Sequence, residues 1–375
     1  MRTSDPAAVL PGIDEHPHAR AVLGGALAPG GQPSHAYLFH GPAGTGKREI
    51  ARAFASALLA DDESQLQSVT ERVTRNTHPD LIWVAPSGAS EMLVSDIEEP
   101  VVAGATRTPF EATRRVFVIE SAQKMNEQAA NRMLKTLEEP PAFVHLILLA
   151  DRREEVLATI TSRCQQVRFD PLASEHIQRR LLERGVEQVT AEACAQLALG
   201  DAQLADWLTS PEGATLRAHA ESFVGASLDG HTDRCPWNGL LDAARAAGEL
   251  AGERARVATE AELELLPKKE HRRHLREGSE AQRRAERRAR IHTLDRGLRL
   301  VELWLRDLWC VAQGAEQLIY ASDRRSELAN AAQATQLVRG MELVTDTRLR
   351  LVLNVSETLA LEALCYRLAE LFAAD

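Results

Sequence analysis

Aromatic residues and cysteines are sparse in this chain. Phe, Trp and Tyr together make up 4% of its 375 residues, and none of the five cysteines stands at the Cys-x-x-Cys spacing of a metal site. An odd number of scattered cysteines argues against a disulfide framework and against a zinc module. No apolar run reaches about 18 residues, so we expect no membrane span. The first residues lack the apolar core of a signal peptide, and we expect a cytoplasmic protein.

Basic charge is also in deficit, with 44 Lys and Arg against 54 Asp and Glu, for a formal net charge of −10. This excludes a protein that binds nucleic acid through its overall charge. Residues 268–290 are an exception, with ten Lys or Arg and four Glu. A contact with DNA or a protein partner is one interpretation. The default is a solvated helix with ion pairs such as Glu280–Arg284 and Glu286–Arg290, and no aromatic residue is interleaved for base stacking.

The apolar pattern predicts an α/β fold followed by helices. Short apolar runs separated by helical patterns are typical of a parallel sheet with helices on both faces. We place its five strands at residues 36–39, 81–85, 115–120, 145–150 and 166–169. Beyond Pro171 we expect short helices over 174–208, a turn at 210–213, and helices to the end with breaks near 229–230, 235–236 and 266–267. The predicted domains are 1–170, 171–213 and 214–375.

A phosphate-binding loop follows the first predicted strand and opens a helix. It reads GPAGTGK over residues 41–47, and its candidate nucleotide-binding residues are Gly41, Gly44, Thr45, Gly46 and Lys47. In such loops the glycines let backbone N–H groups surround the phosphates, Lys neutralises them, and the next residue is a Ser or Thr that ligates magnesium. Arg48 stands in that last place, so the magnesium ligand is missing.

A second motif in a working site of this kind ends a strand with two acidic residues, one for magnesium and one for the attacking water. Here the third strand ends in Glu120-Ser121. Glu120 has the reach to contact a metal, or it caps the next turn, but Ser121 cannot polarise water as a carboxylate does. With both motifs altered, we expect at most weak ATP binding and no hydrolysis.

Arg163 is the candidate catalytic residue, within Thr161-Ser162-Arg163-Cys164. An Arg at this place after the fourth strand is able to stabilise the charge on a γ-phosphate bound to an adjacent subunit. The alternative is a surface Arg paired with a carboxylate. We interpret Cys164 as a small buried residue rather than a nucleophile, because no His partner is indicated.

These motifs resemble those of the delta-prime subunits of the bacterial DNA polymerase III clamp loader, over residues 34–170. The resemblance is carried by residues 34–39 before the loop, by His78-Pro79-Asp80 before the second strand, by AANRMLKTLEEPP at 129–141, and by the Ser-Arg-Cys segment. It implies an AAA+ module with a five-stranded parallel sheet, a small helical lid, and an all-α C-terminal collar domain. Apolar positions such as Leu298, Val301, Leu305 and Leu308 suit either collar packing or an ordinary core, and a core is the default.

The resemblance also implies a function. The chain would be a non-hydrolysing stator that supplies Arg163 in trans while the complex loads the sliding clamp on primed DNA. Its partners would be the gamma/tau and delta subunits, with clamp and DNA met through the complex. No cofactor would be required. The polymerase activity would belong to the holoenzyme and not to this chain.

One departure and two alternatives remain open. Family members usually carry a four-cysteine zinc module before the His-Pro-Asp segment, but residues 61–77 contain no cysteine; we predict a short capped helix and no structural zinc. The first alternative is an active gamma/tau-like motor subunit, which should keep Lys-Ser/Thr and Asp-Glu pairs at the two motifs. The second is a nucleic-acid-binding protein acting through residues 268–290, which predicts salt-dependent DNA binding.

Overall fold

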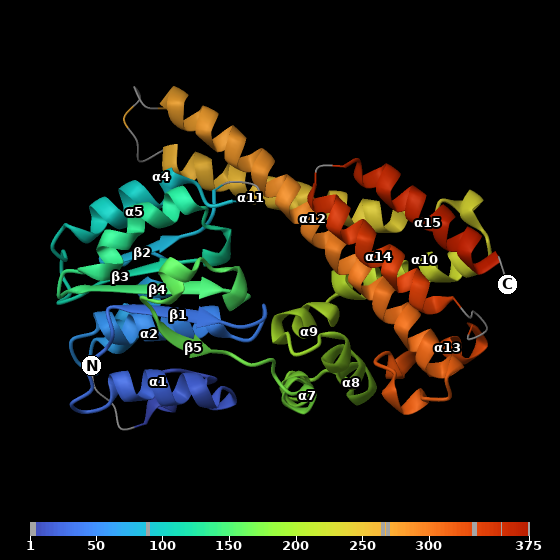
Figure 1. Ribbon diagram of the computed structural model, residues 1–375, viewed down its shortest axis with the longest axis horizontal. Coiled ribbons are helices and arrows are strands. Elements are labelled where there is room, and N and C mark those ends of the chain that lie inside the picture. The colour runs from blue at the N-terminus through green and yellow to red at the C-terminus, as the bar shows by residue number, and fades with distance from the viewer. Residues whose placement is uncertain are drawn as a thin grey trace. The chain divides into compact units, whose positions relative to one another are not determined.

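A computed structural model describes residues 5–87, 91–263, 267, 271–331, 336–353 and 355–373, without the side chains of residues 262, 330, 331 and 352 (Figure 1). The chain divides into two compact units. The first takes the residues up to 172 together with 200–202, and the second takes 173–199 and 203–375. The second unit therefore draws on both the predicted segment 171–213 and the predicted segment 214–375. Among the described residues, no helix combines the length and apolar character that crossing a membrane requires.

The first unit is built on five parallel strands in the order β2-β3-β4-β1-β5 (Figure 1). The strands are β1 (Ala36–His40), β2 (Leu81–Val84), β3 (Arg115–Ile119), β4 (Val144–Ala150) and β5 (Gln165–Arg168). Each lies within a residue or two of its predicted range. The predicted parallel five-stranded sheet is confirmed, because four- to six-residue apolar runs between helical patterns carry a strong local signal.

Helices cover both faces of this sheet. They are α1 (Pro17–Leu27), α2 (Lys47–Leu59), α3 (Leu66–Thr74), α4 (Val94–Ile97), α5 (Glu127–Glu138) and α6 (Ala158–Thr161), with a π-helical turn at Glu98–Ala103. Side chains alternate between the faces: Tyr37 and Phe39 pack with α1, α2 and α3, whereas Leu38 packs with α4, α5 and α6. The predicted short helix over 61–77 is α3, although its N-cap residue Gln65 makes no side-chain cap hydrogen bond.

The second unit is helical in its described part. Its helices are α7 (Ser174–Glu183), α8 (Gln188–Leu197), α9 (Ala202–Leu208, whose first residue belongs to the first unit), α10 (Pro211–Leu228), α11 (Asn238–Leu263), α12 (His271–Ala312), α13 (Arg325–Ala331), α14 (Leu337–Val352) and α15 (Glu357–Ala373). Gly185, Gly200 and Gly230 have positive φ, as expected for residues that end helices. Of the predicted breaks, 229–230 and 235–236 lie between helices, while residue 266 lies outside the described residues.

The predicted turn at 210–213 is wrong. Ser210 is the N-cap of α10, and its side chain accepts a hydrogen bond from the backbone N–H of Gly213 at 3.2 Å. Pro211 then occupies the first helical position, where its missing N–H costs nothing and its fixed φ suits a helix. Ser-Pro followed by Glu therefore starts a helix here instead of turning the chain.

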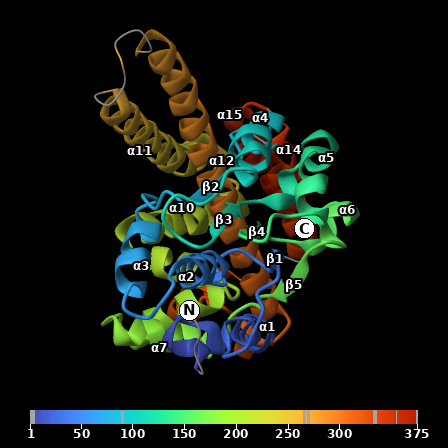
Figure 2. The same cartoon turned by 90° about the vertical axis from the view of Figure 1, so that its left-hand side faces the viewer.

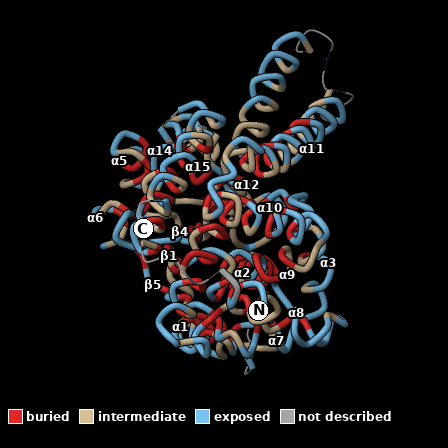
Figure 3. The backbone as a smooth tube through the Cα atoms, turned by 90° about the vertical axis from the view of Figure 1, so that its right-hand side faces the viewer, coloured by how far each residue is buried: buried red, intermediate tan, exposed pale blue. Residues whose placement is uncertain are grey.

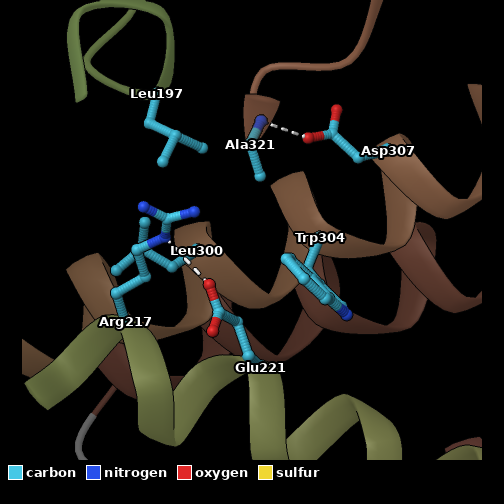
Figure 4. A pocket seen from close by; sticks show the side chains of 7 residues that line it. All are labelled: Leu197, Arg217, Glu221, Leu300, Trp304, Asp307 and Ala321. Carbon is cyan, nitrogen blue, oxygen red and sulfur yellow. Dashed lines mark hydrogen bonds and ion pairs between the residues drawn. The ribbon is translucent and has the colours of Figure 1, made fainter. Parts of the chain in front are cut away.

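The core of the second unit combines apolar helix faces with buried ion pairs. Leu298, Val301, Leu305 and Leu308 of α12 are all fully buried. Arg217 of α10 is buried too; its guanidinium makes two hydrogen bonds to Asp323, at 2.7 and 2.8 Å, and lies 2.8 Å from Glu221. Figure 4 shows Arg217 and Glu221 beside Leu300 and Trp304 of α12.

Burial raises the pKa of two carboxyl groups in this core. The Glu221 carboxyl loses hydration, and the nearby Arg217 only partly offsets that rise in its pKa. Burial likewise raises the pKa of Asp307, against the lowering effect of the backbone N–H donors of Ala321 and Tyr320. Such groups stabilise a unique packing only while every partner stays in place.

Candidate functional site

The loop at residues 41–47 lies at the carboxyl end of β1 and leads into α2, as predicted. Gly41, Gly44 and Gly46 all have positive φ, a backbone region that residues with a Cβ atom rarely adopt. Space is also short, since a Cβ atom on Gly41 would lie 2.0 Å from the carbonyl oxygen of Phe169. The Thr45 hydroxyl donates to the Pro42 carbonyl at 3.0 Å. These glycines and the Thr45 hydrogen bond thus fix the shape of the loop.

Lys47 is turned back onto its own loop. Its ammonium donates to the carbonyls of Gly41 and Pro42, at 2.8 and 2.9 Å, and to the Asp151 carboxylate at 2.8 Å. Asp151 directly follows β4, the strand beside β1. An ammonium has three N–H donors, and here all three have partners. Only 10% of the Lys47 side chain is exposed, so it does not reach for an outer phosphate.

Arg48 and Glu120 are paired with each other. The Arg48 guanidinium lies 2.7 Å from Glu120 Oε1, and the indole N–H of Trp83 donates to the same oxygen. Arg48 and Arg52 also lie over the Trp83 ring, 5.7 and 4.1 Å from its centroid. A guanidinium thus takes the place of the missing hydroxyl and pairs with the carboxylate of the second motif. These residues do not fit a magnesium-bound nucleotide, and we derive no step through one.

Three further residues, which the sequence did not point to, contact the loop from outside. The Asp201 carboxylate lies against Gly44, so closely that a Cβ atom there would be 1.6 Å from Asp201 Oδ1, and the Ala202 N–H donates to the Gly44 carbonyl at 3.2 Å. The buried His16 hydrogen-bonds through Nε2 to the Thr45 carbonyl at 2.7 Å, and burial lowers its pKa. A carboxylate at the loop opposes the binding of a phosphate, since like charges repel.

Arg163 lies in an exposed turn between α6 and β5. Its Nε and Nη2 both donate to Glu138 Oε1, at 2.9 and 2.5 Å, and its Nη1 donates to the Thr159 carbonyl at 2.9 Å. Glu138 ends α5, within the predicted signature segment 129–141. The Arg163 side chain is 34% exposed and that of Glu138 is 49% exposed. The guanidinium is therefore partly open to solvent.

Arg163 and the loop lie at opposite edges of the sheet. In the parallel register of β1 and β5, Tyr37 pairs with Gln165 and His40 pairs with Arg168. Arg163 precedes β5 and is therefore at the amino edge, whereas Gly41 follows β1 at the carboxyl edge. Glu120 and Asp151 follow β3 and β4, also at the carboxyl edge. The fold therefore brings together the predicted loop residues and Glu120, and keeps Arg163 apart from them.

Two other predicted motifs have structural roles. Cys164 is buried, and burial raises the pKa of its thiol to about 12, so it stays protonated and is not a nucleophile. Asp80 is fully buried and accepts three backbone N–H groups, from Phe110, Glu111 and Ala112, at 2.6 to 2.9 Å. The His-Pro-Asp segment thus fixes the loop that leads into β3. Among the described residues, no three His, Cys, Asp or Glu side chains form a cluster able to hold a metal ion.

Comparison with known proteins agrees with these motifs. The sequence profile of the family described as "DNA polymerase III, delta subunit" matches residues 18–173. Over this region the chain is similar to delta-prime subunits of DNA polymerase III. The delta-prime subunit of Bacillus subtilis is 32% identical over 191 residues, 49% of this chain and 57% of that protein. The Pseudomonas aeruginosa delta-prime subunit is 34% identical over 171 residues, 44% of this chain and 52% of that protein.

A tau subunit of DNA polymerase III is also similar in sequence. The tau subunit of Bacillus subtilis is 33% identical over 154 residues, 40% of this chain and 27% of that protein. The solved structure of a gamma subunit-related protein from Thermotoga maritima aligns with 94% of this chain over 98% of its own length, with 16% sequence identity and a TM-score of 0.45. The chain spans about half the length of the two delta-prime relatives.

Proposed function

We propose that this chain is a non-hydrolysing, delta-prime-type subunit of a DNA polymerase III clamp loader. In this proposal Arg163 acts in trans on a nucleotide held by a neighbouring ATPase subunit, during loading of the sliding clamp on primed DNA. Gamma/tau and delta subunits are the proposed partners. Segments 171–213 and 214–375 are proposed as the lid and the collar domain, and the cytoplasm as the compartment.

The position of Arg163 on the sheet is the observation that carries this proposal. The guanidinium lies at the amino edge, while the chain's own loop lies at the carboxyl edge. A γ-phosphate that Arg163 contacts must therefore belong to another chain. An Arg supplied in this way stabilises the charge that develops in phosphoryl transfer.

The state of the loop supports the same proposal against the motor alternative. Lys47 and Arg48 stand at the two positions that contact phosphate and magnesium in a working loop. Each of these side chains is paired with a carboxylate of this chain. A motor subunit needs these positions for substrate and magnesium. No nucleotide and no zinc is required in the proposed role, and any ATP binding is weak.

Replacing Arg163 by Ala in the reconstituted complex tests the proposal. Turnover at the neighbouring ATPase site should fall by about 10³-fold, the usual range for an arginine supplied in trans. Complex assembly and thermal unfolding should change little, because an exposed ion pair contributes about 1 kcal/mol or less.

Arg152→Ala is the matched control. Arg152 is an exposed Arg that pairs with Glu155 at 3.1 Å, but it follows β4 at the carboxyl edge. Its loss should leave complex ATPase unchanged. Unchanged ATPase in the Arg163→Ala complex would sink the trans assignment.

A further inference from the structure

Helices α11 and α12 form a long antiparallel hairpin in the second unit, whose far ends extend beyond the other helices of that unit (Figures 1 and 2). Small residues let the two helices approach closely. Cβ atoms on Gly248 and Gly252 would lie 2.7 and 2.3 Å from side-chain atoms of Arg290 and Glu286, and one on Gly278 would lie 2.3 Å from Thr259. Residues 271–293 of α12 include no buried residue, and Figure 3 draws the far part of this helix in tan and pale blue. The two helices are therefore closely packed along their seam, while their outer faces are exposed.

Charge divides unequally between the two helices. Residues 238–263 of α11 carry five acidic residues and three Arg, whereas residues 271–290 of α12 carry eight Arg and three Glu. The first half of α12 is thus strongly basic in a chain whose net charge is −10.

The predicted i,i+4 pairs account for only part of this basic charge. Glu280 lies 3.7 Å from Arg284 and 3.7 Å from Arg276. The predicted Glu286–Arg290 pair is wrong, since Arg290 pairs with Glu357 of α15 at 3.3 Å and Glu286 accepts from Gln282. The helix seam explains this, because the Glu286 and Arg290 side chains lie over α11 glycines. Lys268 and Lys269 lie outside the described residues.

Four arginines share one face of α12. Arg272, Arg276, Arg283 and Arg287 follow the helical repeat and fall within a sector of about 60°, over a length of about 22 Å. We call them the arginine stripe. Arg272 and Arg283 are exposed, and the Arg276 side chain is 85% exposed. Within the described part of the chain, Arg272, Arg283 and Arg287 have no ion-pair partner.

We propose that the arginine stripe binds the phosphate backbone of double-stranded DNA. A straight row of guanidinium groups on a rigid helix matches a rigid, uniformly charged rod, on which charges recur every ~1.7 Å. A single guanidinium group donates two parallel hydrogen bonds to the oxygens of a phosphate. No Phe, Trp or Tyr occurs between residues 271 and 292, so this face offers no ring on which the bases of single-stranded DNA could stack. The contact is therefore independent of sequence.

Salt dependence of duplex binding by the full chain tests this proposal. A fluorescein-labelled DNA duplex of about 20 base pairs, followed by anisotropy, should bind at about 50 mM salt and lose about 10²-fold in affinity by about 200 mM, since each phosphate contact contributes a slope of about −0.9. The variant R272Q/R276Q/R283Q/R287Q should lose most of this slope and bind about 10²-fold more weakly at the lower salt.

The matched control is R245Q/R256Q/R339Q/R350Q, which removes the same charge. Each of these arginines is exposed and already pairs with a carboxylate on its own helix. The control should bind the duplex as the unaltered chain does, and circular dichroism should give equal helix content for all three proteins. Equal weakening by both variants, a preference for single-stranded DNA, or no duplex binding at the lower salt would overturn the proposal.

Discussion

Lys47 and Arg163 are both cations paired with a carboxylate of the same chain, yet their settings differ. Lys47 is nearly buried, and its three N–H donors go to two carbonyls of its own loop and to Asp151. The Arg163 side chain is one-third exposed and forms an ion pair with an exposed Glu138. The two carboxylates are about equally exposed, Asp151 at 51% and Glu138 at 49%, so the pairs differ in the cation: water reaches the Lys47 ammonium little, whereas water and salt screen Arg163 more. The difference teaches that the lysine of a familiar loop motif can be fully paired within its own chain, while an arginine elsewhere in the domain stays partly open to solvent.

The largest expected contrast is in ATPase of the reconstituted complex. Lys47→Ala should leave turnover within about twofold, whereas Arg163→Ala should cost about 10³-fold at the neighbouring site, because the proposed function assigns the γ-phosphate contact to Arg163 and none to Lys47. Steady-state phosphate release from complexes of equal subunit content measures both. A large loss with Lys47→Ala would mean that this loop is in use, and the contrast would fail.

Acid should act on the scaffold that both sites share. His145 lies in β4, which begins shortly after Glu138 and ends beside Asp151. Burial lowers its pKa from 6.5 to about 4, against the raising effect of its hydrogen bond to the Ser34 carbonyl. Between pH 6.5 and about 4, His145 therefore binds a proton in the unfolded chain but not in the folded chain. Stability should therefore fall as the pH drops from about 6.5 to about 4, by up to about 3 kcal/mol.

Urea unfolding at a series of pH values measures this effect. The variant His145→Gln keeps a donor for the Ser34 carbonyl and removes the titration, so its stability should depend less on pH over the same window. An identical pH profile for both proteins would show that His145 is not the group responsible.

A smaller contrast compares the two carboxylate partners. Asp151→Asn leaves a mostly buried ammonium with a weaker partner and should lower the free energy of unfolding by about 1–2 kcal/mol. Glu138→Gln breaks an exposed pair and should lower it by less than about 1 kcal/mol. Thermal or urea unfolding of the two variants side by side checks the order. If Glu138→Gln lowered the free energy of unfolding more than Asp151→Asn does, our account of which ion pair contributes more to stability would be wrong.

The sequence predicted the five strands and the loop that follows the first of them, because each is a local pattern of a few residues. It did not predict the partners of the key side chains. Asp151 is 104 residues from Lys47, and Glu138 is 25 residues from Arg163. Asp201 is further still from Gly44. Such pairs form only when strands and helices that are distant in the sequence pack together, and the periodicity of the sequence carries no record of that packing.

Two wrong predictions have the same kind of origin. The Ser-Pro pair at residues 210–211 suits a turn or a helix start, and the helix wins because Pro211 and the Ser210 cap both favour it. The Glu286–Arg290 spacing suits an ion pair, but packing against α11 and α15 decides where these side chains point.

Nucleotide binding and hydrolysis by the purified chain, with and without magnesium, test the central claim most directly. Calorimetric titration with ATP and an assay of phosphate release should give no hydrolysis and weak or absent binding that magnesium does not strengthen. That result would fit a loop that does not hold a magnesium-bound nucleotide, with Arg163 as the residue that acts in phosphoryl transfer. Robust magnesium-dependent turnover would contradict it, and would place this chain among the motor subunits despite Arg48 and Ser121.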